Sequence, residues 1–244
     1  KNEKIKELVK LQTTKGRKKA GMYLLEGEHL VEEAVKENAP IELIVVSSNR
    51  LEDYQLLLSQ TNAQLLVVSQ DVFQKLSMTE TTQGILAVVE IVKQEALPQN
   101  GRMIVLDAVQ DPGNLGTIVR TADAAGFDAV ILGTGTVDLY NDKVLRSMQG
   151  SHFHLPLIRM KKEALCQLIE ESQLPLYATT LSKDSVDYRN LVPSTSFVLV
   201  MGNEGQGISS EMVKKADKLV HITMPGQAES LNVAVAAGIL MFAL

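Results

Sequence analysis

Runs of apolar residues alternate with amphipathic segments along the whole chain. In the first half, apolar or alternating runs predict β-strands over residues 23–27, 41–47, 64–68 and 84–92. Apolar residues at helical spacing predict helices over residues 29–39, 51–60 and 71–77. This order of strands and helices is typical of an α/β unit.

The same alternation begins again after residues 93–102, where Pro98, Asn100 and Gly101 interrupt the pattern and predict a linker. Strands are predicted over residues 103–109, 129–132, 176–180, 196–202 and 219–224. Helices are predicted over residues 114–126, 142–150, 161–172, 209–216 and 231–244. Because these strands are apolar on both faces, we expect a parallel sheet covered by helices on each side. The sequence therefore predicts two α/β domains, residues 1–97 and 102–244.

Composition places the chain among ordinary globular proteins, with 45% apolar and 22% charged residues. A single cysteine, Cys166, excludes an internal disulfide and a cysteine-based zinc site. The sequence contains no apolar run of about 18 residues and no signal-peptide pattern at its start, so we expect a cytoplasmic protein without a membrane span.

Charge is distributed unevenly. The chain has a net charge of -5, yet residues 1–20 contain eight Lys or Arg against two Glu. Such a stretch attracts a phosphate backbone, although short basic termini are also common as solvated helices. From charge alone, both interpretations remain open.

Polar residues and glycines gather at three predicted strand ends, where parallel α/β sheets bind ligands. At the first, the strand over residues 103–109 leads through Asp111 to a helix that carries Asn114 and Arg120. Arg120 follows Asn114 by six positions, which is just under two helical turns, so both side chains can face one site. Alternatively, Asn114 is only the N-cap of this helix and Arg120 a surface arginine.

At the second strand end, Gly202, Gly205 and Gly207 surround Glu204. Glycines let a ligand approach the backbone closely. The pattern is neither a Walker loop nor the dinucleotide motif GxGxxG. A carboxylate here would repel a pyrophosphate, so the loop suits a sulfonium better than a nucleotide phosphate.

At the third, ITMPGQAESLNVAVAAGIL places Ser230 and Asn232 around the start of an apolar helix. Their hydroxyl and amide groups can enter one cavity. Alternatively, Ser230 is the N-cap and Asn232 is incidental.

Together the stretches NLGTIVRTADAAG, LVMGNEGQGIS and ITMPGQAESLNVAVAAGIL closely resemble the three signature motifs of the SpoU (TrmH-type) RNA ribose 2'-O-methyltransferases of the SPOUT superfamily, in order and approximate spacing. The resemblance covers residues 102–242. RKKAGMYLLEGEHLVEEA and MTETTQGILAVV also resemble this family's N-terminal substrate-binding domain, an α/β unit similar to ribosomal RNA-binding proteins.

The resemblance implies a deep trefoil knot in the C-terminal domain, S-adenosylmethionine as the cofactor and a homodimer that packs knot against knot. The final helix fits such an interface, although it could equally be buried within one subunit. Cofactor-binding residues carried over by motif position are Gly202, Ile222, Met224, Leu231, Thr180 and Leu181.

The catalytic residues implied by the resemblance are Asn114, Arg120, Glu204, Ser230 and Asn232. In the family, Arg120 is the candidate that helps the ribose 2'-hydroxyl lose its proton. A guanidinium normally keeps its own proton, so two roles remain open. Arg120 is either held unprotonated and acts as the base, or it stays cationic and stabilises the developing alkoxide.

The family segment that approaches RNA resembles NDKVLRSMQGSHFHLPLI. Candidate RNA contacts are Arg146 and Ser147 in this segment and Arg17, Lys18 and Lys19 in the basic N-terminal arm. The alternative for Arg146 and Ser147 is a solvated helix end. His152 and His154 are expected on one face of a strand, but no third ligand accompanies them, so we expect no metal.

The predicted function is 2'-O-methylation of an RNA ribose, with ribosomal RNA favoured because of the separate N-terminal RNA-binding domain. Two alternatives within the family are a transfer RNA methyltransferase and a catalytically silent RNA-binding protein. A nicotinamide-dependent oxidoreductase would need an early GxGxxG followed by an acidic residue, and the sequence has neither.

Overall fold

The computed structural model describes residues 3–94, 97–192 and 194–244, which form two compact units. The first unit comprises the chain up to Val92 together with Asp138–Phe153, and the second comprises Lys93–Val137 and His154–Leu244. Residues 138–153 thus belong to the first unit, whereas the predicted division assigned them to the C-terminal domain. The predicted linker includes residues 95 and 96, which lie outside the description.

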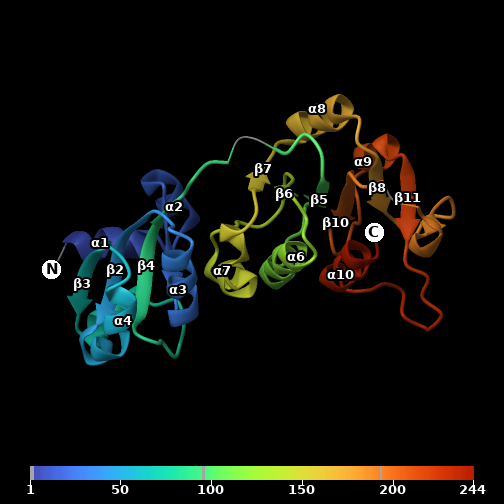
Figure 1. The fold of residues 1–244 in the computed structure, drawn as a ribbon. Helices are drawn as coiled ribbons and strands as arrows, with labels where there is room; N and C mark the ends of the chain where they lie inside the picture. Colours follow the sequence, from blue (N-terminus) through green and yellow to red (C-terminus); the bar gives the residue numbers. More distant parts are fainter. Residues whose placement is uncertain (1–2, 95–96, 193) are drawn as a thin grey trace. The chain divides into compact units, whose positions relative to one another are not determined.

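The first unit is a four-stranded sheet with helices on its faces (Figure 1). Its strands are β1 (Met22–Glu26), β2 (Ile41–Ser47), β3 (Gln64–Val68) and β4 (Ile85–Glu90). Its helices are α1 (Glu3–Lys10), α2 (Thr14–Ala20), α3 (Glu28–Lys36), α4 (Gln55–Leu58), α5 (Gln70–Leu76) and α7 (Asp142–Met148), with 3-10 turns η1 (Ser48–Arg50), η2 (Glu52–Tyr54) and η3 (Ser151–Phe153).

The strand order is β1-β4-β2-β3, antiparallel except for the β2–β3 pair. The apolar side chains of α1 and α5, such as Leu8 and Phe73, pack against one face of this sheet. Helix α7 packs against β1 and buries Val144, Leu145 and Met148. The predicted helix over residues 51–60 is wrong in extent, because a 3-10 turn occupies its first half and α4 contains only four residues.

The second unit is a seven-stranded sheet between two layers of helices. Its strands are β5 (Arg102–Asp107), β6 (Ala129–Leu132), β7 (Leu157–Arg159), β8 (Leu176–Thr179), β9 (Val186–Asp187), β10 (Phe197–Gly202) and β11 (Lys218–His221). Its helices are α6 (Pro112–Ala124), α8 (Lys162–Ser172), α9 (Ser210–Lys215) and α10 (Val233–Ala243), with one 3-10 turn, η4 (Tyr188–Asn190).

All neighbouring strands pair in parallel, in the order β7-β6-β5-β10-β8-β11-β9. This confirms the predicted parallel sheet. Helices α8 and α9 cover one face, and α6 and α10 lie together on the other (Figure 1). Strand β8 lies between β10 and β11, and all three are parallel, so the loops that follow them leave the sheet from the same side.

Among the described residues, no helix has both the length and the apolar character that crossing a bilayer requires.

Candidate active site

A cavity of about 670 Å³ opens at the carboxyl ends of β8, β10 and β11 in the second unit. Four stretches contribute the residues that line it: 179–181, 201–208, 220–224 and 229–240. Its volume lies within the roughly 300–1,000 Å³ range of small-molecule sites. This is the edge where parallel sheets bind their ligands.

All the residues predicted to bind the cofactor line this one cavity: Thr180, Leu181, Gly202, Ile222, Met224 and Leu231. They come from three loops that are separated by about twenty residues each in sequence. Gly202, at the end of β10, is buried, and the loop that follows folds back over it through mutual backbone hydrogen bonds between Asn203 and Gly207.

The charged residues of the cavity are acidic. Glu204 and Glu229 line it, and its described lining includes no Lys or Arg. Apolar side chains such as Met201 and Leu240 supply surface for a planar ring. The cavity therefore fits a ligand with a cationic centre and an apolar ring better than it fits a phosphate ester.

A chain of side-chain hydrogen bonds joins the three predicted motifs. The Asn232 amide donates to Asn114 Oδ1 at 2.9 Å, and the Asn114 amide donates to Glu204 Oε1 at 3.2 Å. The structure thus brings together three of the five predicted catalytic side chains, which come from α6, the loop after β10 and the start of α10.

Glu204 also accepts two backbone hydrogen bonds from the loop before α6, from Gln110 at 3.2 Å and from Asp111 at 3.1 Å. Burial by itself would raise the pKa of Glu204, but hydrogen bonds from backbone N–H groups and from the Asn114 amide lower it on balance. The carboxylate is therefore an acceptor only, which fixes the Asn114 amide as the donor.

Both alternative assignments of the helix caps are wrong. The N-cap of α6 is Asp111, whose carboxylate accepts from the Asn114 backbone at 2.8 Å, because Pro112 occupies the first helical position. The N-cap of α10 is Asn232, which accepts from the Ala234 and Val235 backbone, so Ser230 does not cap it. Capping and the contact with Asn114 use opposite ends of one Asn232 amide.

The other two predicted catalytic residues lie apart from this chain of hydrogen bonds. Ser230 is exposed and lines the cavity. Arg120 is exposed on α6 and does not line the cavity. Glu204 and Asn114 bond to each other, Asn114 also bonds to Asn232, and Glu204 accepts from the neighbouring backbone.

Sequence reasoning missed Asn203. Its amide donates to the Ala108 carbonyl at 2.8 Å, and its Oδ1 accepts from the Gly205 and Gln206 backbone, both at 2.9 Å. It therefore shapes the loop that carries Glu204. An asparagine directly after a buried strand, with a glycine two positions later, is a sequence signal for such a turn.

The predicted RNA contacts differ in exposure. Lys18 and Lys19 are exposed on α2. Arg17 is wrong as an exposed phosphate contact: it is 5% exposed, pairs with Asp138 at 2.7 Å and donates to the carbonyls of Leu11 and Gln12.

The remaining candidate RNA contacts lie on α7 of the first unit. Arg146 is exposed and pairs with Asp142 one turn earlier, at 2.9 Å, and Ser147 is half-buried.

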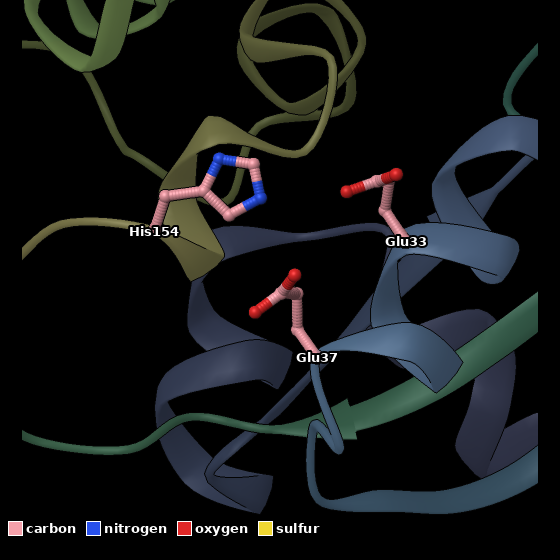
Figure 2. A group of neighbouring side chains, drawn as sticks. All are labelled: Glu33, Glu37 and His154. Carbon is pink, nitrogen blue, oxygen red and sulfur yellow. The ribbon is translucent and has the colours of Figure 1, made fainter.

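His152 and His154 do not share a strand, because Ser151–Phe153 is a 3-10 turn and the two histidines belong to different units. Figure 2 shows His154 together with Glu33 and Glu37 of the first unit. Within its own unit, His154 Nδ1 shares a hydrogen bond with Asp123 at 2.7 Å. A group of side chains drawn from both units supports no metal site.

Two family models match this chain. The SpoU rRNA methylase family matches residues 101–242, which contain the cavity and its three loops. The chain belongs to this family. The MRM3-like substrate binding domain matches residues 2–87.

Known relatives match over nearly their whole length. The 23S rRNA (guanosine(2553)-2'-O)-methyltransferase RlmP of Bacillus subtilis is 44% identical over all of this chain and 96% of its own. The crystal structure of an AdoMet-bound rRNA methyltransferase from Sinorhizobium meliloti is 32% identical, with a TM-score of 0.88 over 99% of this chain and 94% of that one.

A further structure, the SpoU methyltransferase AviRb from Streptomyces viridochromogenes in complex with AdoMet, is 26% identical. Its TM-score is 0.91 over 100% of this chain and 97% of that chain. These comparisons agree with the predictions from the motifs in three respects. They show the same family, a two-part α/β fold, and S-adenosylmethionine (AdoMet) bound to proteins with this fold.

Proposed function

We propose that this protein transfers a methyl group from S-adenosylmethionine to a ribose 2'-hydroxyl of ribosomal RNA. The observation that carries the proposal is the cavity itself, whose charged lining is acidic and whose wall includes the second and third family motifs. The choice of ribosomal RNA rests on the RlmP relative, which covers the whole chain.

Bound S-adenosylmethionine would supply a methyl group activated by its sulfonium centre. In this proposal Gly202, Ile222, Met224 and Leu231 hold its adenosine part largely through backbone groups, and Thr180 and Leu181 close the wall beside them. The carboxylates of Glu204 and Glu229 favour a cationic ligand electrostatically.

The catalytic roles follow from the hydrogen-bond chain. Asn232, Asn114 and Glu204 form a polar chain in which each amide NH2 group donates to the next side chain, and Ser230 adds a hydroxyl to the cavity lining. Arg120 is exposed, and a guanidinium in water carries a positive charge. We therefore assign Arg120 the electrostatic role, in which it holds the phosphate beside the ribose and stabilises the developing alkoxide, in preference to the role of base.

The proposal includes a cytoplasmic homodimer and a trefoil knot formed by the loops around the cavity. Val235 and Phe242 on α10 are 53% and 67% exposed, and apolar side chains on a terminal helix suit burial against a second copy. Lys18, Lys19, Arg146 and Ser147 are the proposed RNA contacts of the first unit.

Calorimetry with S-adenosylmethionine and with NAD tests the class of function. We expect saturable one-site binding of S-adenosylmethionine and none of NAD, because the cavity lacks a phosphate-binding glycine motif at a helix N-terminus. Binding of NAD without binding of S-adenosylmethionine would contradict the proposal and favour a nicotinamide-dependent oxidoreductase.

A further inference from the structure

The Asp187 carboxylate accepts hydrogen bonds from two separate parts of the second unit. It ends β9 and is 9% exposed. Its carboxylate accepts from the Arg189 backbone at 2.9 Å and from Arg189 Nε and Nη2 at 2.8 and 2.9 Å. It also accepts from Thr223, through the backbone N–H at 3.3 Å and through the side-chain hydroxyl.

The Arg189 bonds are local, because they fix the 3-10 turn that Asp187 caps. The Thr223 bonds cross 36 positions of sequence and reach the segment that leaves the sheet after β11. Asp187 pairs in register with His221, the last residue of that strand, so the segment begins directly beside the carboxylate.

Thr223 lies between two residues of the cavity wall. Ile222 and Met224 line the cavity, whereas Thr223 does not. Thr223 is held on Asp187 through both its backbone N–H and its hydroxyl, which fixes the chain between these two lining residues. The Thr223 hydroxyl therefore influences the positions of Ile222 and Met224 without lining the cavity itself.

We propose that Asp187 and Thr223 form a clamp that positions Ile222 and Met224 to bind S-adenosylmethionine. Both are positioning residues, because they act on the cofactor through their neighbours. This inference rests on the proposed function, since it concerns the same cavity.

The chemistry of the pair makes the hydroxyl the donor. Hydrogen bonds from Arg189, then from Thr223, hold the pKa of Asp187 far below its ordinary value, so the carboxylate is ionised and accepts only. A serine at position 223 keeps the hydroxyl donor, whereas a valine keeps the shape of threonine but lacks the hydroxyl.

The test compares Thr223→Val with Thr223→Ser in the full chain, by calorimetric titration with S-adenosylmethionine. We expect Thr223→Val to raise the Kd about tenfold, as for loss of a hydrogen bond to a charged group. Thr223→Ser should remain within about twofold of the wild type. Methyl transfer at saturating S-adenosylmethionine should change less than about twofold in both variants, because the clamp contacts no reacting atom.

Asp187→Asn serves as the second variant and should also weaken binding, since it replaces the ionised acceptor. Circular dichroism and thermal melting establish that each variant is folded. A Kd for Thr223→Val within twofold of the wild type would overturn the proposal, and so would equal weakening by valine and serine. Failure of the wild type itself to bind S-adenosylmethionine would instead overturn the proposed function.

Discussion

At the scale of single residues, Gly202 shows how tightly the cavity wall is built. A Cβ atom at this position would lie 2.3 Å from the Gly207 carbonyl carbon and 2.5 Å from the Ile208 nitrogen. Both are backbone atoms of the loop that folds back over β10, so neither can rotate away. A Cβ at Gly226, in the loop that follows Met224, would meet no described atom within 4 Å.

Gly202→Ala should therefore displace the loop and raise the Kd for S-adenosylmethionine by about tenfold or more, in line with the usual cost of overpacking. Gly226→Ala is the matched control, and its Kd should stay within about twofold of the wild type, because Gly226 does not line the cavity. Both values can be measured by calorimetry beside a thermal melt. Equal affinities for the two variants would mean that the close approach at Gly202 does not shape the site.

Single residues also show what the sequence could and could not predict. The six cofactor candidates line one cavity because motif position determines which loop each residue occupies. The caps considered as alternatives, Asn114 and Ser230, do not cap α6 and α10. Capping residues lie close together here, and the sequence alone did not show that Asp111 and Asn232 take these positions. Asp187 was missed because its partner Thr223 is 36 residues away and no local pattern links them.

At the scale of elements, Arg17 and Asp138 join α2 to the segment that precedes α7. They are 121 residues apart in sequence, and their side chains are 6% and 28% exposed. Burial alone would raise the pKa of Asp138, but hydrogen bonds from Arg17 and from the Tyr140 backbone lower it overall. The sequence predicted an exposed basic arm that includes Arg17. It could not show that Arg17 is buried, because its acidic partner Asp138 lies far away along the chain.

Asp138→Asn should lower the free energy of unfolding by about 2 kcal/mol at pH 7, because it leaves the buried Arg17 without its counter-charge. Asp142→Asn breaks an exposed pair with Arg146 and should cost less than about 1 kcal/mol. Because the folded-state pKa of Asp138 is lowered, its contribution is present above the ordinary value of 3.8 and is lost as the pH falls through the folded-state value.

Urea unfolding of the wild type and both variants at pH 7 and at acid pH measures these differences. The gap between wild type and Asp138→Asn should shrink in acid. A gap that is no larger than for Asp142→Asn at pH 7 would contradict the structural role of the pair.

At the scale of the whole molecule, the alternation of apolar runs was enough to predict two α/β parts and one parallel sheet. It could not predict that residues 138–153 belong to the first unit. The pattern of α7 shows an apolar face made by Val144, Leu145 and Met148, and such a face can pack on any apolar sheet. Only the tertiary structure shows that it packs against β1.

The functional segments are divided between the two units. The cavity, the hydrogen-bond chain and the clamp all belong to the second unit, within the residues that match the SpoU family model. The proposed RNA contacts Lys18, Lys19, Arg146 and Ser147 belong to the first unit, whereas Arg120, the proposed phosphate contact beside the ribose, belongs to the second. Binding of the cofactor is therefore expected to depend on loops of the second unit alone, whereas binding of RNA involves residues of both units.

Transfer of a labelled methyl group from S-adenosylmethionine to ribosomal RNA, with the modified position mapped, tests the central claim most directly. The account predicts a ribose 2'-O-methyl group with the wild type. Arg120→Ala should bind S-adenosylmethionine within about twofold of the wild type but transfer methyl groups about 10² to 10³ times more slowly, as for loss of one electrostatic stabiliser. A methyl group on a base, or an Arg120→Ala rate within a few-fold of the wild type, would contradict it.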